Sequence, residues 1–230
     1  MNTFQTLNLA HSSTVDRVAE ELRRALFDGE VEAGTPLREI ALADAMGVSR
    51  STIREALGIL VNEGLATREP NRGVRVTELD PVAVHDVSVA RAVLEIAGVQ
   101  RWEQAQEHSR EACRAALADF GEVARSSPSP AELTAAHLVL HRSFVGLTES
   151  TRLVALAETL TAEIRLALAK VDRIRQNAGA QVHSHETLLR LLDAGETDAA
   201  VAELAQHLHD AESSMLTALD LVPGQTGGRS

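Results

Sequence analysis

The stretch LREIALADAMGVSRSTIREALGILVNEGLATREPNRGVRV, residues 37–76, decides the fold of the first third of this chain. Apolar side chains recur at helical spacing over residues 38–46, and the pattern stops at Gly47. Ser49 is placed to cap a second helix that continues through Leu60. Two short helices joined by a glycine-containing turn of this length predict a helix-turn-helix.

The segments on either side of this motif complete a small domain. Apolar residues over 65–68 and 74–77 flank the turn-forming residues 70–73, which predicts a β-hairpin. Upstream, residues 14–27 carry the apolar spacing of one further helix. We therefore predict a winged helix-turn-helix, built of three helices and a hairpin wing, over residues 11–78.

The remainder of the chain, from Pro81 to about Leu221, has helical periodicity in every long segment. Helix-breaking residues gather near four places: 126–130, 148–150, 177–179 and 194–195. The predicted fold class is therefore mainly α, a winged helix-turn-helix followed by an all-α antiparallel helical bundle over residues 79–222. Residues 1–10 are predicted to be flexible, and the Gly-rich tail 223–230 is predicted to be disordered.

The composition predicts a globular protein. The 230 residues are 44% apolar, which suffices for a packed core, and a single cysteine, Cys113, allows no intramolecular disulfide. The N-terminus lacks the basic start and apolar run of a signal peptide, and no run of about 18 apolar residues offers a membrane span. We expect a soluble, cytoplasmic protein with no membrane partner.

The net charge of −11 is unfavourable for a nucleic-acid-binding protein unless its basic residues are clustered. Residues 49–75 reverse the balance, with five arginines against three glutamates. Because Lys170 is the only lysine, contacts to phosphates and bases fall to arginine side chains and backbone amides. We predict a small basic surface for double-stranded DNA on an acidic body.

The second helix of the motif carries hydrogen-bond donors near its N-terminus, where a recognition helix enters the major groove. They are Ser49, Arg50, Ser51, Thr52 and Arg54. The hairpin tip, Arg72 and Gly73, suits the minor groove or the adjacent phosphates. The alternatives are a solvated helix of some other bundle and an ordinary surface hairpin. The order of helix, turn, capped helix and wing favours DNA binding.

Four of the nine histidines fall on the apolar faces of three predicted helices in the second domain. They are His137, His141, His185 and His207. For each one alone, a core histidine bonded to a neighbour is the alternative, but four buried imidazoles without a common partner would leave many polar nitrogens to satisfy. A divalent transition metal would satisfy them together, with zinc as the first candidate and nickel, copper or iron as the others.

Arg91 lies on the inward face of the first helix of this domain, where a guanidinium needs an anionic partner. That partner is either an internal acid, Glu95, Glu158 or Glu163, or the carboxylate of a bound effector. The aromatic content of 2%, with no tyrosine, argues against a stacking pocket for a nucleobase or flavin. We expect the effector to be a small organic acid.

The stretch from Leu37 to Val76, which contains GVSRSTIREALGILVNEGLATREPNRGVRV, resembles the winged helix-turn-helix of the GntR family of transcription regulators. The helical remainder resembles the FCD-type ligand-binding domain of its FadR subfamily. The resemblance implies that Arg50 and Arg54 contact the operator and that the predicted hairpin tip is the wing tip. Ile40 stands where some relatives carry a DNA-contacting arginine. Arg38, two residues earlier, is the candidate to make that contact instead.

The same resemblance bears on the histidines. FCD domains of the metal-binding kind use an Asp or Asn four residues before a His, and two further histidines on later helices. His141, His185 and His207 match the three histidines, and His137 stands at the acidic position. Either this nitrogen shifts the metal preference toward zinc, nickel or copper, or His137 does not bind the metal. The resemblance also implies that Arg91 and the metal hold the effector carboxylate together.

These features predict a homodimeric repressor that its effector releases from DNA, because two recognition helices must meet a two-fold operator. One alternative is a metal-dependent hydrolase, but the sequence has no HExxH, GxSxG or phosphate-cradling motif. We therefore expect no enzymatic activity. The other alternative is a DNA-binding protein with a purely structural metal and no effector.

Overall fold

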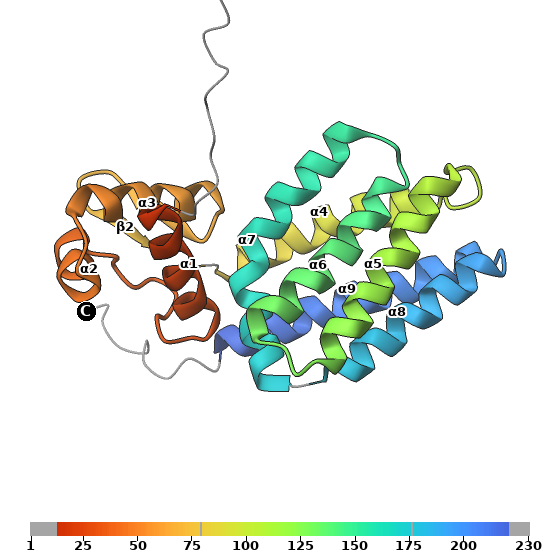
Figure 1. Ribbon diagram of the computed structural model, residues 1–230. Coiled ribbons are helices and arrows are strands. Elements are labelled where there is room, and N and C mark those ends of the chain that lie inside the picture. Colours follow the sequence, from red (N-terminus) through yellow and green to blue (C-terminus); the bar gives the residue numbers. More distant parts are fainter. Residues whose placement is uncertain (1–12, 79, 176, 221–230) are drawn as a thin grey trace, which may run out of the picture.

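The computed structural model describes residues 13–78, 80–175 and 177–220, which form two helical units joined by a short connector (Figure 1). The first unit contains α1 to α3 and a two-stranded hairpin, and the second contains α4 to α9. In chain order the elements are α1 Thr14–Phe27, α2 Glu39–Met46, α3 Arg50–Asn62, β1 Ala66–Glu69, β2 Gly73–Val76, α4 Pro81–Val99, α5 Glu107–Arg125, α6 Pro130–Gly146, α7 Thr151–Arg175, α8 Ala178–Asp193 and α9 Thr197–Asp220. The predicted fold class is confirmed.

The winged helix-turn-helix is formed by local signals that are visible in the sequence. Gly47 ends α2 in the left-handed conformation, with φ of 65°, and the Ser49 hydroxyl accepts from the amide of Thr52 at 3.1 Å to begin α3. The wing strands pair antiparallel, with Ala66 opposite Val76. Side chains from all three helices and both strands share one apolar core.

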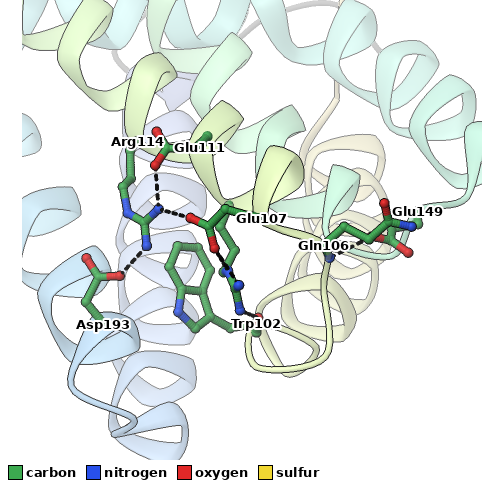
Figure 2. Close-up of polar contacts among 8 residues, drawn as sticks. Trp102, Gln106, Glu107, Glu111, Arg114, Glu149 and Asp193 are labelled. Atoms are coloured by element: carbon green, nitrogen blue, oxygen red, sulfur yellow. Dashed lines mark hydrogen bonds and ion pairs between the residues drawn. The ribbon is translucent and has the colours of Figure 1, made fainter.

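The helical unit contains one break that the sequence does not signal. Residues 100–106 separate α4 from α5 without a glycine or proline. Figure 2 shows Trp102 beside the guanidinium of Arg114, which lies 5.3 Å from the indole centroid and also binds Asp193 of α8 at 2.7 Å. The amide of Gln106 donates to Glu149 at 2.8 Å. Partners from distant parts of the chain stabilise this turn, which is why helical periodicity does not predict it.

The two units also contact each other through α7, which lies beside α1 in Figure 1. Ala169 of α7 is buried in the apolar core of the winged helix-turn-helix. The guanidinium of Arg165 lies 5.0 Å from the ring centroid of Phe27, the fully buried last residue of α1. The helical unit is thus packed against the winged helix-turn-helix as well as tethered to it.

Two terminal predictions lie outside the described residues, namely the flexible segment 1–10 and the disordered tail 223–230. Within the part of the chain that the structure describes, no helix has both the length and the apolar character needed to cross a bilayer.

Helix α4 approaches α6 closely at Gly98, which is buried. A Cβ atom built on Gly98 would lie 1.9 Å from the carbonyl oxygen of Phe144 and 2.8 Å from its carbonyl carbon. Because these are backbone atoms within a helix, no side-chain rotation relieves the overlap. The position therefore has room only for glycine at this helix separation.

We expect Gly98→Ala to lower the free energy of unfolding by about 1–3 kcal/mol, because α4 and α6 must separate to admit the methyl group. Urea unfolding followed by circular dichroism measures the change. Gly146→Ala is the matched control, since a Cβ at Gly146 meets nothing within 4 Å. Equal stability of the two variants would contradict the predicted close approach.

Candidate metal centre and DNA interface

Helices α6, α8 and α9 bring four imidazoles to one point inside the helical unit. His137 and His141 lie one turn apart on α6, His185 lies on α8 and His207 on α9. The Nε2 atom of His141 is 3.0 Å from Nε2 of His137 and 3.2 Å from Nε2 of both His185 and His207. The four candidate ligand atoms all lie within 4.8 Å of one another, and His137, His141 and His185 are buried. The structure thus brings together all four histidines that the sequence singled out.

Hydrogen bonds from the other ring nitrogen, Nδ1, orient two of these rings. Nδ1 of His185 donates to the backbone carbonyl of Gln181 at 2.7 Å, and Nδ1 of His141 donates to the carboxylate of Glu95 at 2.6 Å. In a neutral imidazole the other nitrogen, Nε2, then carries a lone pair. His141 and His185 therefore aim lone pairs at each other across 3.2 Å, an arrangement that a cation between them makes favourable.

Burial keeps these imidazoles in the neutral form that binds metals. It lowers the pKa of His137 and His141 well below 6.5, and the neighbouring imidazoles and Arg91 add to the effect. Burial likewise lowers the pKa of His185, and it lowers that of His207 to about 2. At neutral pH the four imidazoles are therefore neutral, and the Nε2 lone pairs of His141 and His185 are free to bind a metal ion.

The donor set fits a transition metal ion. Imidazole nitrogen is a preferred ligand of zinc, nickel, copper and iron, and hydrogen bonds from Nδ1 to a carboxylate or carbonyl are typical of histidine ligands. Among the described residues, these four histidines form the one group of three or more His, Cys, Asp or Glu side chains with this convergence. An ion held here would join α6, α8 and α9.

Arg91 has an internal partner in this structure. Its Nε donates to Oε1 of Glu95 at 3.0 Å, and both side chains are buried. Burial raises the pKa of Glu95, and the Arg91 guanidinium opposes that shift. Of the three acids considered from the sequence, Glu95 is thus in contact, whereas Glu158 pairs with Arg142 on the surface and Glu163 is exposed. A chain of contacts runs from Arg91 through Glu95 to His141.

The predicted DNA-contacting residues lie on the exposed side of the winged helix-turn-helix. The hydroxyl groups of Ser49, Ser51 and Thr52 form a hydrogen-bonded cluster at the start of α3. The side chains of Arg50 and Arg54 are 60% and 58% exposed. These donors are brought together at the N-terminus of the recognition helix.

The wing and the second helix present further exposed residues. Arg72 is exposed in the turn between β1 and β2, and Gly73 is exposed as the first residue of β2. Arg38 is exposed at the N-cap of α2, and the side chain of Ile40 projects from the first turn of that helix, 58% exposed. Arg38 is thus exposed two residues before position 40, where some relatives carry a DNA-contacting arginine.

Sequence reasoning missed Glu39, which binds the recognition helix. Its two carboxylate oxygens accept from Nε and Nη2 of Arg54 at 3.0 and 2.7 Å, and Arg50 lies 3.9 Å away. These hydrogen bonds lower the pKa of Glu39. No local pattern signals this pair, because the contact between Glu39 and Arg54 depends on how α2 packs against α3.

An exposed arginine cluster on a winged helix-turn-helix, joined to a helical domain, defines a DNA-binding transcription regulator. Comparison with known families agrees. Residues 14–76 match "Bacterial regulatory proteins, gntR family", and residues 86–210 match the FCD domain. The chain belongs to the GntR family, with an FCD domain after its winged helix-turn-helix. It is a transcription regulator and not an enzyme, which excludes the hydrolase alternative.

Individual relatives support the same class. The protein named "Probable D-xylose utilization operon transcriptional repressor" of Paenarthrobacter nicotinovorans is 27% identical over 203 residues, 87% of this chain and 88% of its own. A gluconate operon transcriptional repressor of Bacillus licheniformis is 41% identical over 87 residues, 38% of this chain and 35% of its own. The crystal structure of a GntR transcriptional regulator from Rhodococcus sp. RHA1 is 30% identical, covers 89% of this chain and 98% of its own, and has a TM-score of 0.71.

The buried histidines predict acid sensitivity of the metal-free protein. Their pKa values are lower in the folded than in the unfolded state, so the unfolded chain takes up protons first as the pH falls below about 6.5. We expect the free energy of unfolding to fall with pH in that range, by up to about 1.4 kcal/mol per pH unit for each buried histidine. Urea unfolding at pH 7.5, 6.5 and 5.5 after chelation measures this dependence.

Two variants test whether the pH dependence of the free energy of unfolding comes from the histidines of this cluster or from other titrating groups. His207→Gln should give a shallower dependence than the wild type. His183→Gln should leave the dependence unchanged, because the His183 side chain is 82% exposed. A wild-type slope in His207→Gln would contradict the assignment.

Proposed function

We propose that this chain is a homodimeric, cytoplasmic repressor whose operator affinity depends on a metal ion and on a small carboxylate effector. Residues 11–78 would bind double-stranded operator DNA, and residues 79–222 would bind both ligands and form the dimer. The observation that carries the metal assignment is the convergence of four Nε2 atoms, with two rings held by Glu95 and a backbone carbonyl. Zinc is the first candidate for the ion.

The DNA assignment is supported by the exposed donors on α3. The forked guanidinium groups of Arg50 and Arg54 suit guanine edges and phosphates, and the short hydroxyl side chains at Ser49, Ser51 and Thr52 suit phosphates and bases. Arg38, Arg72 and Gly73 would add contacts on either side. Glu39 holds the Arg54 guanidinium in a defined position before DNA is present. A homodimer follows from the two-fold symmetry of operators that such helices read.

The repressor assignment is supported by the relatives. The D-xylose and gluconate operon proteins are named as repressors, and the first of them aligns with most of this chain. The match to the gluconate operon protein spans only 87 residues, so it supports the regulatory role and not the effector.

The effector assignment is supported by the charge and the polar groups around the histidines. A divalent ion among four neutral imidazoles would leave a charge of about +2, because Arg91 and Glu95 cancel each other. An anion bound nearby would offset that charge. Ser88, one turn before Arg91 on α4, is buried, and its hydroxyl has no hydrogen-bond partner among the described residues. Arg91 and Ser88 are therefore the groups that we propose for the effector carboxylate.

We expect Arg50→Ala and Arg54→Ala each to weaken operator binding by about 10- to 100-fold, because each removes a charged contact at the major groove. An operator would first be selected from a random duplex library with the wild-type protein. Fluorescence anisotropy at fixed salt then measures the dissociation constants. Arg152→Ala, an exposed arginine on α7, is the control and should bind normally. Unchanged binding by both α3 variants would rule out this surface.

We expect a small carboxylate to raise the melting temperature of the zinc-loaded protein and to reduce its operator affinity. A thermal-shift screen of mono- and dicarboxylates, run before chelation, after chelation and after zinc is returned, measures the effect. The shift should shrink after chelation, because the positive charge that attracts the acid is lost, and Arg91→Gln should abolish it.

The same screen distinguishes the proposed effector-binding repressor from the remaining alternative, a DNA-binding protein with a structural metal and no effector. If chelation lowers the melting temperature but no acid raises it in the zinc-loaded protein, the metal is structural and the proposed effector is wrong. If zinc changes neither the melting temperature nor operator binding, the metal assignment is wrong as well.

A further inference from the structure

We propose that Glu39 determines the sequence specificity of the DNA interface by restricting Arg54 to the recognition of guanine. The carboxylate acts through the Arg54 guanidinium and does not itself touch DNA, so Glu39 is a positioning residue. This inference rests on the proposed function for the DNA-binding surface. It goes further by assigning how that surface distinguishes an operator from any other duplex.

The Glu39 carboxylate occupies one edge of the Arg54 guanidinium and leaves another edge free. Its Oε1 accepts from Nε at 3.0 Å and its Oε2 accepts from Nη2 at 2.7 Å, so the pair is bidentate. The remaining hydrogens on Nη1 and Nη2 form a second fork. Such a fork has the shape that donates to O6 and N7 of guanine in the major groove. Arg54 therefore keeps a complete recognition fork while Glu39 holds the opposite edge.

The Arg54 guanidinium depends on Glu39 for its orientation. The side chain of Arg54 is 58% exposed, and Glu39 is the one partner that it has among the described residues. Glu39 is only 25% exposed and lies in the first turn of α2. Hydrogen bonds from Arg54 lower the pKa of Glu39, and the nearby charges of Arg50 and Arg68 lower it further. The carboxylate is therefore ionised at neutral pH.

Arg50 provides the contrast on the same helix. Its Nη2 lies 3.9 Å from Oε2 of Glu39, which is too long for a hydrogen bond, and its side chain is 60% exposed. An arginine that is not held can turn toward the phosphates of a duplex of any sequence. The recognition helix thus carries one held arginine suited to a base and one free arginine suited to the backbone.

An acid in this place lowers the affinity for DNA in general and favours the correct sequence. Glu39 offsets the charge of Arg54, which weakens the attraction to phosphates in every duplex alike. The free fork of Arg54 is already oriented, so it loses little conformational entropy when it meets a guanine. Both effects raise the specificity ratio, which is the dissociation constant for an unrelated duplex divided by that for the operator.

Glu39→Gln tests the assignment, because glutamine keeps the size of the side chain but loses the charge and cannot accept both hydrogen bonds. Fluorescence anisotropy at fixed salt measures binding to the selected operator and to a duplex of scrambled sequence. We expect the specificity ratio to fall by about 5-fold or more, the smallest discrimination typical of a bidentate contact to guanine. Binding to the scrambled duplex should tighten, because the released guanidinium is free to meet phosphates.

Glu55→Gln is the matched control. Glu55 is an exposed acid that follows Arg54 directly on α3, so this variant removes the same charge from the same helix without releasing the guanidinium. It should strengthen binding to both duplexes alike and keep the specificity ratio of the wild type.

A double-mutant cycle ties the effect to Arg54. In an Arg54→Ala background, Glu39→Gln should lower the ratio no further, since no guanidinium remains to be held. In an Arg50→Ala background it should lower the ratio as much as it does in the wild type. Substitution of each operator base pair should show that Glu39→Gln and Arg54→Ala relax the preference at the same position.

The outcomes separate this inference from the proposed function. Normal operator binding by both Arg50→Ala and Arg54→Ala would overturn the DNA-binding surface itself. If those variants bind weakly but Glu39→Gln lowers the ratio no more than Glu55→Gln, only the role of Glu39 is wrong. A fall in the ratio that persists in the Arg54→Ala background would also overturn that role. If Glu39→Gln does not fold, Glu39→Asp replaces it, because the shorter side chain cannot reach both nitrogens and should also lower the ratio.

Discussion

The convergence of four imidazole groups at one point, three of them buried, is the constraint on which the helical domain depends. Two of the rings donate from Nδ1 to fixed acceptors, Glu95 and the carbonyl of Gln181, so their Nε2 lone pairs face each other. Such an arrangement is unfavourable for neutral groups alone and favourable around a cation. The geometry of the bundle and the proposed ion therefore support each other, since an ion would link α6, α8 and α9.

The contacts offer two routes from this centre to the DNA-binding unit. One follows the chain, because α4 carries Arg91 and Glu95 and begins a few residues after the wing. The other runs through packing, because α6 lies against α7, and α7 places Arg165 and Ala169 against the winged helix-turn-helix. A ligand that favours one arrangement of these helices would bias the orientation of the recognition helix.

Much of the fold could be predicted from local signals. The Ser49 cap, the turn at Gly47 and the hairpin are set by interactions within a few residues, so their sequence patterns were sufficient. The turn at residues 100–106 was not predictable in this way. It depends on Trp102, Arg114 and Glu149, which meet only after α5, α6 and α8 have packed.

The sequence by itself determined that four histidines face the core, because helical periodicity assigns each residue to a face. Only the tertiary structure decided that their nitrogens meet, that Glu95 among three candidate acids binds Arg91, and that Glu39 binds Arg54. The physical reason is that periodicity fixes the direction of a side chain relative to its own helix. The neighbour that it meets depends on how that helix packs against helices distant in the chain.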